Sequence, residues 1–172
     1  MKLKIPYLMG AILAAGSLLH LADTPGISAA PLITFDTLSG HNINLAVPMG
    51  KTRLVSFWSP DCSICERDRP NLSHLHQQFS ENELEIIAVA MPYDSHDKVE
   101  SHIDNHAILY QVAHDIDGTI GASFPGVRFT PTTFLIDSEG EIVWRHVGRL
   151  NATEASGQIT ETLQLPKLAD KR

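Results

Sequence analysis

The chain has 172 residues, of which 43% are hydrophobic, and its formal net charge is -7. This length and hydrophobic content suit one domain with its own core, with or without a targeting segment. The acidic balance argues against nucleic-acid binding, which requires a basic face. Two cysteines are too few for a disulfide scaffold or a four-thiolate zinc site.

The N-terminus has the layout of a secretory signal peptide over residues 1–29. Two lysines precede an apolar run at 5–22, and small residues lead to Ala29, after which we expect cleavage. Cleavage one residue later would leave Pro31 directly behind the cut, where it hinders the peptidase. An uncleaved membrane anchor is the alternative, because the run has about 18 residues, near the lower limit for crossing a bilayer. Both alternatives place the folded part outside the cytoplasm.

A single folded domain is expected over 31–165, followed by a polar tail at 166–172. Apolar and polar residues alternate at 35–45 around a turn-forming segment, which predicts a hairpin. The runs at 52–58 and 84–91 are mostly apolar and predict buried strands.

A helix is expected over 62–79, where apolar residues recur at near-helical spacing, with a kink at Pro70. Further helices are expected at 97–106, 118–124 and 153–163, and further strands at 109–113, 132–136 and 142–147. Strands that alternate with helices favour a parallel sheet, and a closing hairpin gives that sheet an antiparallel edge. The sequence therefore predicts an α/β fold with a mixed central sheet and helices on both faces.

The most informative stretch runs from Phe57 to Cys65, where a predicted strand leads directly into a helix that opens with Cys-x-x-Cys. Cys62 is expected at the helix N-terminus, where free N–H groups and the helix dipole stabilise a thiolate. Cys65 follows one turn later, close enough to form a disulfide with it. These positions predict that Cys62 attacks a substrate disulfide and that Cys65 resolves the mixed disulfide.

Two other roles for the cysteine pair stay open at this point. The chain has nine histidines, which offer partners for a copper or zinc site. The pair could also form an inert structural disulfide. That role is disfavoured, because a bridge over so short a loop removes little chain entropy.

Four features of the chain resemble the thioredoxin superfamily. They are the Phe57-Trp58 pair, the Cys62/Cys65 pair, Pro70 and the distant Thr130-Pro131. Within that superfamily, the secretory N-terminus, the early hairpin and an inserted strand-helix segment around 93–113 are similar to the TlpA/ResA-like disulfide reductases of the bacterial periplasm. The resemblance covers residues 31–165 and implies a thioredoxin-like fold.

The resemblance implies roles for further positions. Thr130-Pro131 matches the cis-proline loop that faces the dithiol and holds the substrate chain, and Trp58 is expected to pack beside the cysteines. Asp68 stands where the family places an acidic residue, usually Glu, that exchanges a proton with the buried thiol. The shorter Asp is a departure, and a solvated helix acid is the alternative. Ordinary thioredoxins have a buried Asp at the position that Ser56 occupies here.

Asp61 occupies the position where the family usually has Trp. Its carboxylate is expected to oppose a Cys62 thiolate and to raise the pKa of that thiol, which makes the dithiol more reducing. An equally open alternative is that Asp61 N-caps the helix. No histidine lies between the cysteines to stabilise the thiolate, unlike in strongly oxidising relatives. These features favour a protein-disulfide reductase, whose dithiol carries the electrons itself, so no cofactor is expected.

Two alternatives use other chemistry. His102 and His106 are four residues apart and could chelate a metal, but we expect a solvated helix face and predict no metal site. A periplasmic copper carrier using Cys62, Cys65 and His146 is the non-enzymatic alternative, although related copper proteins space their cysteines by three residues. A thiol peroxidase of the peroxiredoxin type is disfavoured, because its motif requires a proline seven residues before the first cysteine.

The resemblance also implies partners. It suggests client proteins with disulfides, such as apocytochrome c or copper-site assembly factors, and a membrane electron donor. We expect a monomer in the periplasm, either soluble after signal cleavage or tethered to the inner membrane, with no nucleic-acid partner.

Overall fold

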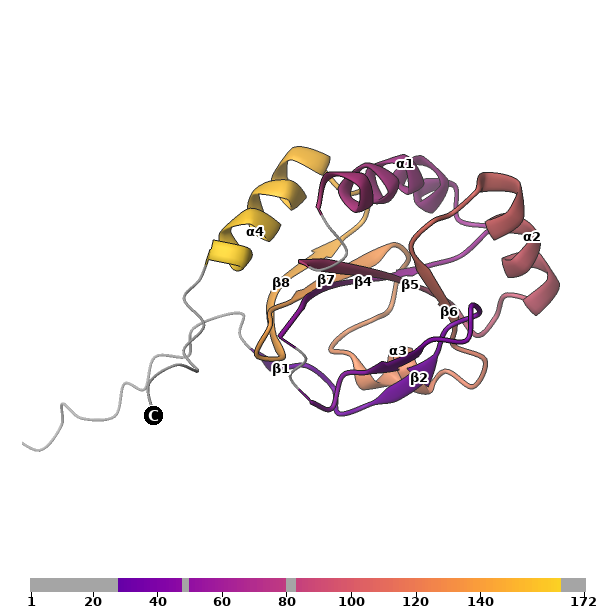
Figure 1. The fold of residues 1–172 in the computed structure, drawn as a ribbon. Helices are drawn as coiled ribbons and strands as arrows, with labels where there is room; N and C mark the ends of the chain where they lie inside the picture. The colour runs from indigo at the N-terminus through magenta and orange to yellow at the C-terminus, as the bar shows by residue number, and fades with distance from the viewer. Residues whose placement is uncertain (1–27, 48–49, 80–82, 165–172) are drawn as a thin grey trace, which may run out of the picture.

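The computed structural model describes residues 28–47, 50–79 and 83–164. Its main sheet has six strands in the order β1-β8-β7-β4-β5-β6 (Figure 1). These strands are β1 (Ser28–Ala29), β4 (Thr52–Trp58), β5 (Leu84–Ala90), β6 (Gln111–His114), β7 (Thr132–Ile136) and β8 (Glu141–Val147). Strand β4 pairs in parallel with β5 and antiparallel with β7, so the sheet is mixed, as predicted.

Helices cover both faces of this sheet, as the sequence predicts. The helices are α1 (Ser63–Gln78), α2 (His96–His106), α3 (Thr119–Ser123) and α4 (Ala152–Gln164). In Figure 1, α1 and α4 lie on one face, and α3 lies on the other together with the predicted hairpin. That hairpin consists of β2 (Thr34–Asp36) and β3 (Asn42–Asn44), which form a separate two-stranded sheet.

Strand β4 is the centre of the core, and all seven of its residues are buried. Alternate side chains point to opposite faces of a strand. Accordingly, Leu54 and Trp58 belong to the hydrophobic cluster that contains Leu75 of α1, whereas Val55 and Phe57 belong to the cluster under α3 and the hairpin. This two-sided burial explains why the sequence of β4 is apolar almost throughout.

Helix α1 runs continuously through Pro70, which is exposed. The predicted helix started one residue earlier, but Cys62 is its N-cap. The sequence did not predict β1, in which Ser28 and Ala29 pair with β8. The expected cleavage after Ala29 stays a prediction, and the rest of the expected signal segment and the polar tail 166–172 lie outside the described residues.

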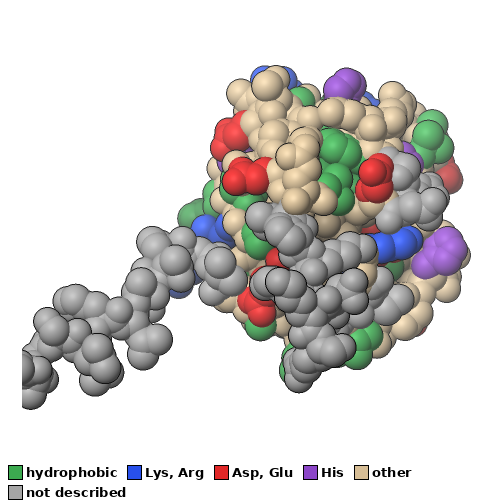
Figure 2. Space-filling view, turned by 60° about the vertical axis from the view of Figure 1, so that its left-hand side comes forward, with side chains coloured by type: hydrophobic (Ala, Val, Ile, Leu, Met, Phe, Trp, Pro, Cys, Tyr) green, Lys and Arg blue, Asp and Glu red, His purple; other side chains and the backbone are tan. Residues whose placement is uncertain are grey.

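Among the described residues, no helix is both long enough and apolar enough to cross a bilayer. On the face shown in Figure 2, acidic side chains lie between the basic ones, and the visible basic side chains are scattered. The described side chains seen on this face therefore form no broad basic surface of the kind that nucleic acids bind.

The burial of α1 against the sheet generates a stability prediction. Leu75 is 0% exposed, so Leu75→Ala leaves a cavity and is expected to lower the free energy of unfolding by about 2–5 kcal/mol. The matched control is Leu109→Ala, since Leu109 is 69% exposed and its loss is expected to cost less than about 0.5 kcal/mol. Urea unfolding of the oxidised proteins measures both. Equal losses would contradict the assignment of Leu75 to the core.

Candidate active site

The two cysteines lie at the start of α1, immediately beyond the end of β4. They form a disulfide with their Cα atoms 5.2 Å apart. Cys62 is the N-cap of α1, and its Sγ accepts a hydrogen bond of 3.1 Å from the backbone N–H of Cys65. Cys62 is half-buried, whereas Cys65 is only 6% exposed. A client can therefore reach Cys62 more easily than Cys65, which agrees with the predicted order of attack.

The Thr130-Pro131 segment faces this dithiol. Its peptide bond is cis, as the family resemblance predicts. The carbonyl oxygen of Thr130 lies 3.5 Å from Cys62 Sγ. A residue just outside β7 and a residue just outside β4 thus meet at one edge of the sheet, where an incoming peptide would meet both the sulfur and the free backbone of the loop.

A buried pair of hydrogen-bonded residues, which the sequence did not predict, fixes the loop between β4 and α1. Ser59 Oγ donates a hydrogen bond of 2.7 Å to Asp94 Oδ1, and both residues are at least nine-tenths buried. The same Ser59 accepts from the N–H of Asp61 through its hydroxyl and from the N–H of Cys62 through its carbonyl. The only sequence signal for Asp94 is an acidic residue shortly after a buried strand.

Asp61 does not cap the helix, so that alternative is wrong. Cys62 occupies the cap position with its own sulfur. Instead the Asp61 carboxylate forms an exposed ion pair with Lys98 of α2. Lys98 offsets part of the negative charge that was expected to act on Cys62.

Asp68 lies one helical turn beyond Cys65 and is 1% exposed, so it is not a solvated helix acid. Its Oδ1 accepts hydrogen bonds from the backbone N–H of Leu150 at 3.0 Å and from Asn71 Nδ2 at 3.1 Å. Its Oδ2 has no hydrogen-bond partner among the described residues. Burial raises the pKa of Asp68, and the bonds from Asn71 and Leu150 oppose that rise. A carboxylate whose pKa is raised accepts a proton more readily than an ordinary Asp.

The position that holds a buried Asp in ordinary thioredoxins has no ionisable group here. Ser56 is 1% exposed and shares a hydrogen bond of 3.0 Å with Thr133 Oγ1 across the β4–β7 pair. Asp68 is therefore a buried acid on α1, one helical turn from Cys65.

Trp58 packs where the resemblance implies, in the cluster that contains Cys65. Its ring contacts His102 of α2, with ring centroids 4.8 Å apart. The expectation that His102 lies on a solvated helix face is wrong, since it is only 9% exposed. Burial lowers its pKa, while the nearby Glu66 acts in the opposite direction. Helix α2 contains few apolar residues, so the spacing of its hydrophobic positions did not predict that His102 is buried.

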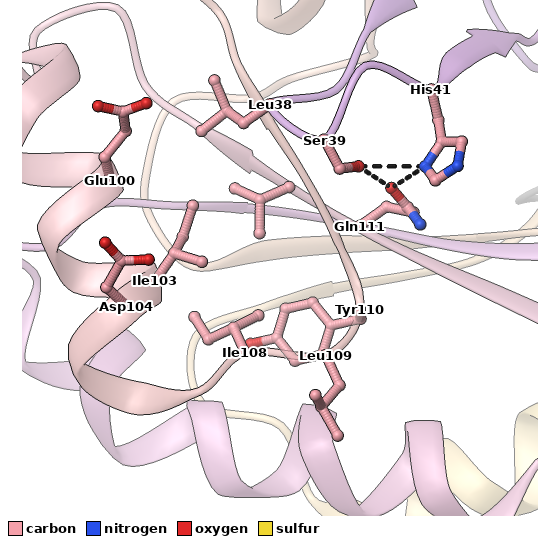
Figure 3. A pocket seen from close by; sticks show the side chains of 11 residues that line it. Leu38, Ser39, His41, Glu100, Ile103, Asp104, Ile108, Leu109, Tyr110 and Gln111 are labelled. Atoms are coloured by element: carbon pink, nitrogen blue, oxygen red, sulfur yellow. Dashed lines mark hydrogen bonds between the residues drawn. The ribbon is translucent and has the colours of Figure 1, made fainter.

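A hollow lies elsewhere, between α2, the hairpin and the start of β6 (Figure 3). It has a volume of about 420 Å³. Ser39, His41 and Gln111 form a triangle of hydrogen bonds at its rim, and these bonds tie the hairpin to β6. Since β6 begins at Gln111, this hollow is at the opposite end of the sheet from the dithiol, and it belongs to the packing of the hairpin.

A buried strand that leads into a helix-capping dithiol opposite a cis-proline loop defines a thioredoxin-fold thiol-disulfide oxidoreductase. Comparisons with known proteins agree. Residues 28–145 match the AhpC/TSA family. "Thiol-disulfide oxidoreductase ResA" of Bacillus thuringiensis is 30% identical over 131 residues, which span 76% of this chain and 74% of that protein. The chain therefore belongs to the AhpC/TSA family and, within it, to the ResA-like thiol-disulfide oxidoreductases.

Other relatives support this assignment. The thioredoxin-like protein YneN of Bacillus subtilis is 29% identical over 134 residues, or 76% of each chain. The solution structure of a putative thioredoxin from Neisseria meningitidis superposes with a TM-score of 0.74 at 26% identity, over 80% of this chain and 91% of that one. DsbF of Mycobacterium tuberculosis, at 23% identity and a TM-score of 0.67 over 76% of this chain and 95% of that one, shows the same fold.

The burial of Asp68 predicts a specific dependence of stability on pH. Because its pKa is raised on folding above the ordinary 3.8, the folded state favours the protonated form. Its ionisation therefore weakens the fold as pH rises from near that value through the raised pKa. Asp68→Asn cannot ionise, so its stability relative to the wild type is expected to increase from pH 4 to pH 7. Urea unfolding of both oxidised proteins across this range measures the difference, and a difference that does not vary with pH would contradict the prediction.

Proposed function

We propose that this oxidoreductase works as a reductase of protein disulfides outside the cytoplasm. The observation that carries the direction is the environment of Cys62 Sγ, which faces the Thr130 carbonyl oxygen at 3.5 Å. A carbonyl oxygen accepts a hydrogen bond from a thiol and repels a thiolate. Less stabilisation of the thiolate favours the disulfide form, and hence a more reducing couple. The Cys65 N–H donates to the same sulfur and acts in the opposite direction.

The proposed reaction moves two electrons from the dithiol to the client. The Cys62 thiolate attacks one sulfur of the client disulfide, forms a mixed disulfide and releases the other client sulfur as a thiolate. Cys65 then loses its proton to Asp68, and its thiolate attacks Cys62 Sγ. This second step forms the Cys62–Cys65 disulfide and releases the second client sulfur as a thiolate.

The remaining parts of the site position the client. Its extended chain is expected to pair with the backbone beside Pro131, as in β-strand addition. Phe129, which precedes this loop, is 71% exposed and offers an apolar contact next to the disulfide. Trp58 supports the buried side of the dithiol, and the Ser59–Asp94 pair fixes the loop that leads into Cys62.

The export and the partners rest on the N-terminal sequence and on the family resemblance. We propose a periplasmic domain, freed by signal cleavage or tethered to the inner membrane, that acts as a monomer. A membrane electron donor is needed to reduce the Cys62–Cys65 disulfide after each cycle. Apocytochrome c and copper-site assembly factors are the client classes that we propose to test first.

Replacement of each cysteine is expected to block a different step of the reaction. Cys62→Ser removes the attacking sulfur and should abolish reduction of a protein disulfide. Cys65→Ser keeps the attack but removes the resolving thiol, so a Cys62-linked mixed disulfide should accumulate. Non-reducing electrophoresis and mass spectrometry of each variant with a disulfide-containing client measure this. Full activity in Cys62→Ser would overturn the proposed function.

The direction of exchange is tested by the equilibrium reduction potential of the Cys62–Cys65 pair against glutathione or thioredoxin. A reductase is expected to have a potential near or below that of thioredoxin, about -270 mV. A value close to that of DsbA, about -120 mV, would show that the protein is an oxidant.

Lys98→Ala leaves Asp61 without its ion-pair partner and should make the couple more reducing, because the unpaired carboxylate opposes the thiolate more strongly.

A further inference from the structure

A cluster of metal-ligating side chains lies where α1 meets α2. Glu66 follows Cys65 in α1, and His102 and His106 are one turn apart in α2. Glu66 Oε1 lies 3.0 Å from His102 Nε2, and Glu66 Oε2 lies 3.7 Å from His106 Nε2. Among the residues that the structure describes, these three form the one group whose donor atoms all lie within 4.8 Å of one another.

The two imidazole rings are held in place by contacts other than those with Glu66. His106 Nδ1 lies 2.8 Å from the backbone carbonyl oxygen of His102. A carbonyl accepts only, so Nδ1 carries the proton and Nε2 of the neutral ring keeps its lone pair towards Glu66. The His102 ring packs against Trp58 and is 9% exposed. Metal-bound histidines are oriented in this way, by a hydrogen bond from the second ring nitrogen and by packing.

Hydrogen bonds do not explain this arrangement. Glu66 Oε1 lies 3.0 Å from His102 Nε2, but among the described residues it is a buried oxygen without a hydrogen-bond partner. The 3.7 Å separation between His106 Nε2 and Glu66 Oε2 is too long for a hydrogen bond. In the form that binds a metal, His106 Nε2 points its lone pair at a carboxylate oxygen, and a cation between the two atoms would bind both.

The spacing suits a tetrahedral transition-metal ion. Zinc binds His nitrogen at about 2.0–2.1 Å and carboxylate oxygen at about 2.0–2.2 Å, so two ligands of a tetrahedron lie about 3.3 Å apart. The observed separations of 3.0 and 3.7 Å are close to this value, although they run to the two different oxygens of Glu66. A cavity of about 20 Å³, lined by Cys65, Glu66 and His102, adjoins the cluster. It has room for about one water molecule.

We propose that Glu66, His102 and His106 bind a zinc ion and that a water molecule completes its coordination. This site goes beyond the proposed disulfide exchange, and the sequence alone led us to expect no metal. Two imidazoles and a carboxylate favour zinc over magnesium or calcium, which prefer sets of oxygen ligands. Arg69 Nε lies 3.9 Å from Glu66 Oε2 and competes with a metal ion for this carboxylate. This competition further disfavours an ion that binds weakly.

The test is calorimetric titration of the full chain, oxidised and without a polyhistidine tag, with zinc chloride. The Cys62–Cys65 disulfide removes both thiolates as ligands, so binding reports on other groups. We expect one saturable site per chain. Glu66→Gln and His106→Ala are each expected to weaken binding more than about 10-fold, since even outer-shell partners of zinc ligands are worth that much. Both positions are partly exposed, and circular dichroism confirms that the variants fold.

The matched control is His96→Ala in the same helix. His96 Nε2 lies 3.3 Å from Glu100 Oε1 in an exposed pair that no third ligand joins within the described ranges, so zinc affinity should not change. Zinc-edge X-ray absorption should show two imidazoles and no sulfur. Absence of saturable binding, or unchanged affinity in Glu66→Gln and His106→Ala, would overturn the zinc site. Neither result touches the proposed reductase, which depends on the separate assay of Cys62→Ser.

Discussion

The pairing of β4 on both sides is the constraint on which the site depends. Parallel β5 ends at the same edge of the sheet as β4, and antiparallel β7 starts there. The end of β4 therefore meets the segment after β5 and the segment before β7. That edge brings together Cys62 at the start of α1, Asp94 after β5, and Thr130-Pro131 before β7. Two-sided burial of β4 makes this register costly to change, because a one-residue slip would exchange the side chains of the two cores.

Burial then shifts the pKa values of groups that pack near this edge. The same packing that covers Cys65 also desolvates Asp68 and His102, and it shifts their pKa values in opposite directions, as expected for an acid and a base. Asp68 remains tolerable in the core because Asn71 and the Leu150 N–H bond to one of its oxygens. Among the residues that the structure describes, its other oxygen has no hydrogen-bond partner. A fully satisfied carboxylate would be a better structural element and a poorer base.

Much of the fold could be predicted from the sequence, because the spacing of hydrophobic residues and the positions of turn-forming residues reveal strands and helices. The seven buried residues of β4, the helix that follows Cys62 and the closing hairpin all leave a local pattern. Contacts between distant elements leave none. The ion pair of Asp61 with Lys98, the Ser59–Asp94 bond and the burial of His102 depend on how α2 packs against the β4–α1 junction. β1 was missed because two residues are too few to show an alternating pattern.

The first turn of α1 also separates two kinds of chemistry that lie next to each other in the chain. Neighbouring residues in a helix point about 100° apart, because a turn contains about 3.6 residues. Cys65 therefore turns into the core beside Trp58, while Glu66 turns towards α2. Trp58 contacts His102 directly, so one aromatic ring borders both the dithiol and the histidine cluster. An ion held by that cluster would fasten α2 to α1 and add a positive charge behind the resolving thiol. The reduction potential measured with and without zinc would then differ, since a nearby cation stabilises a thiolate.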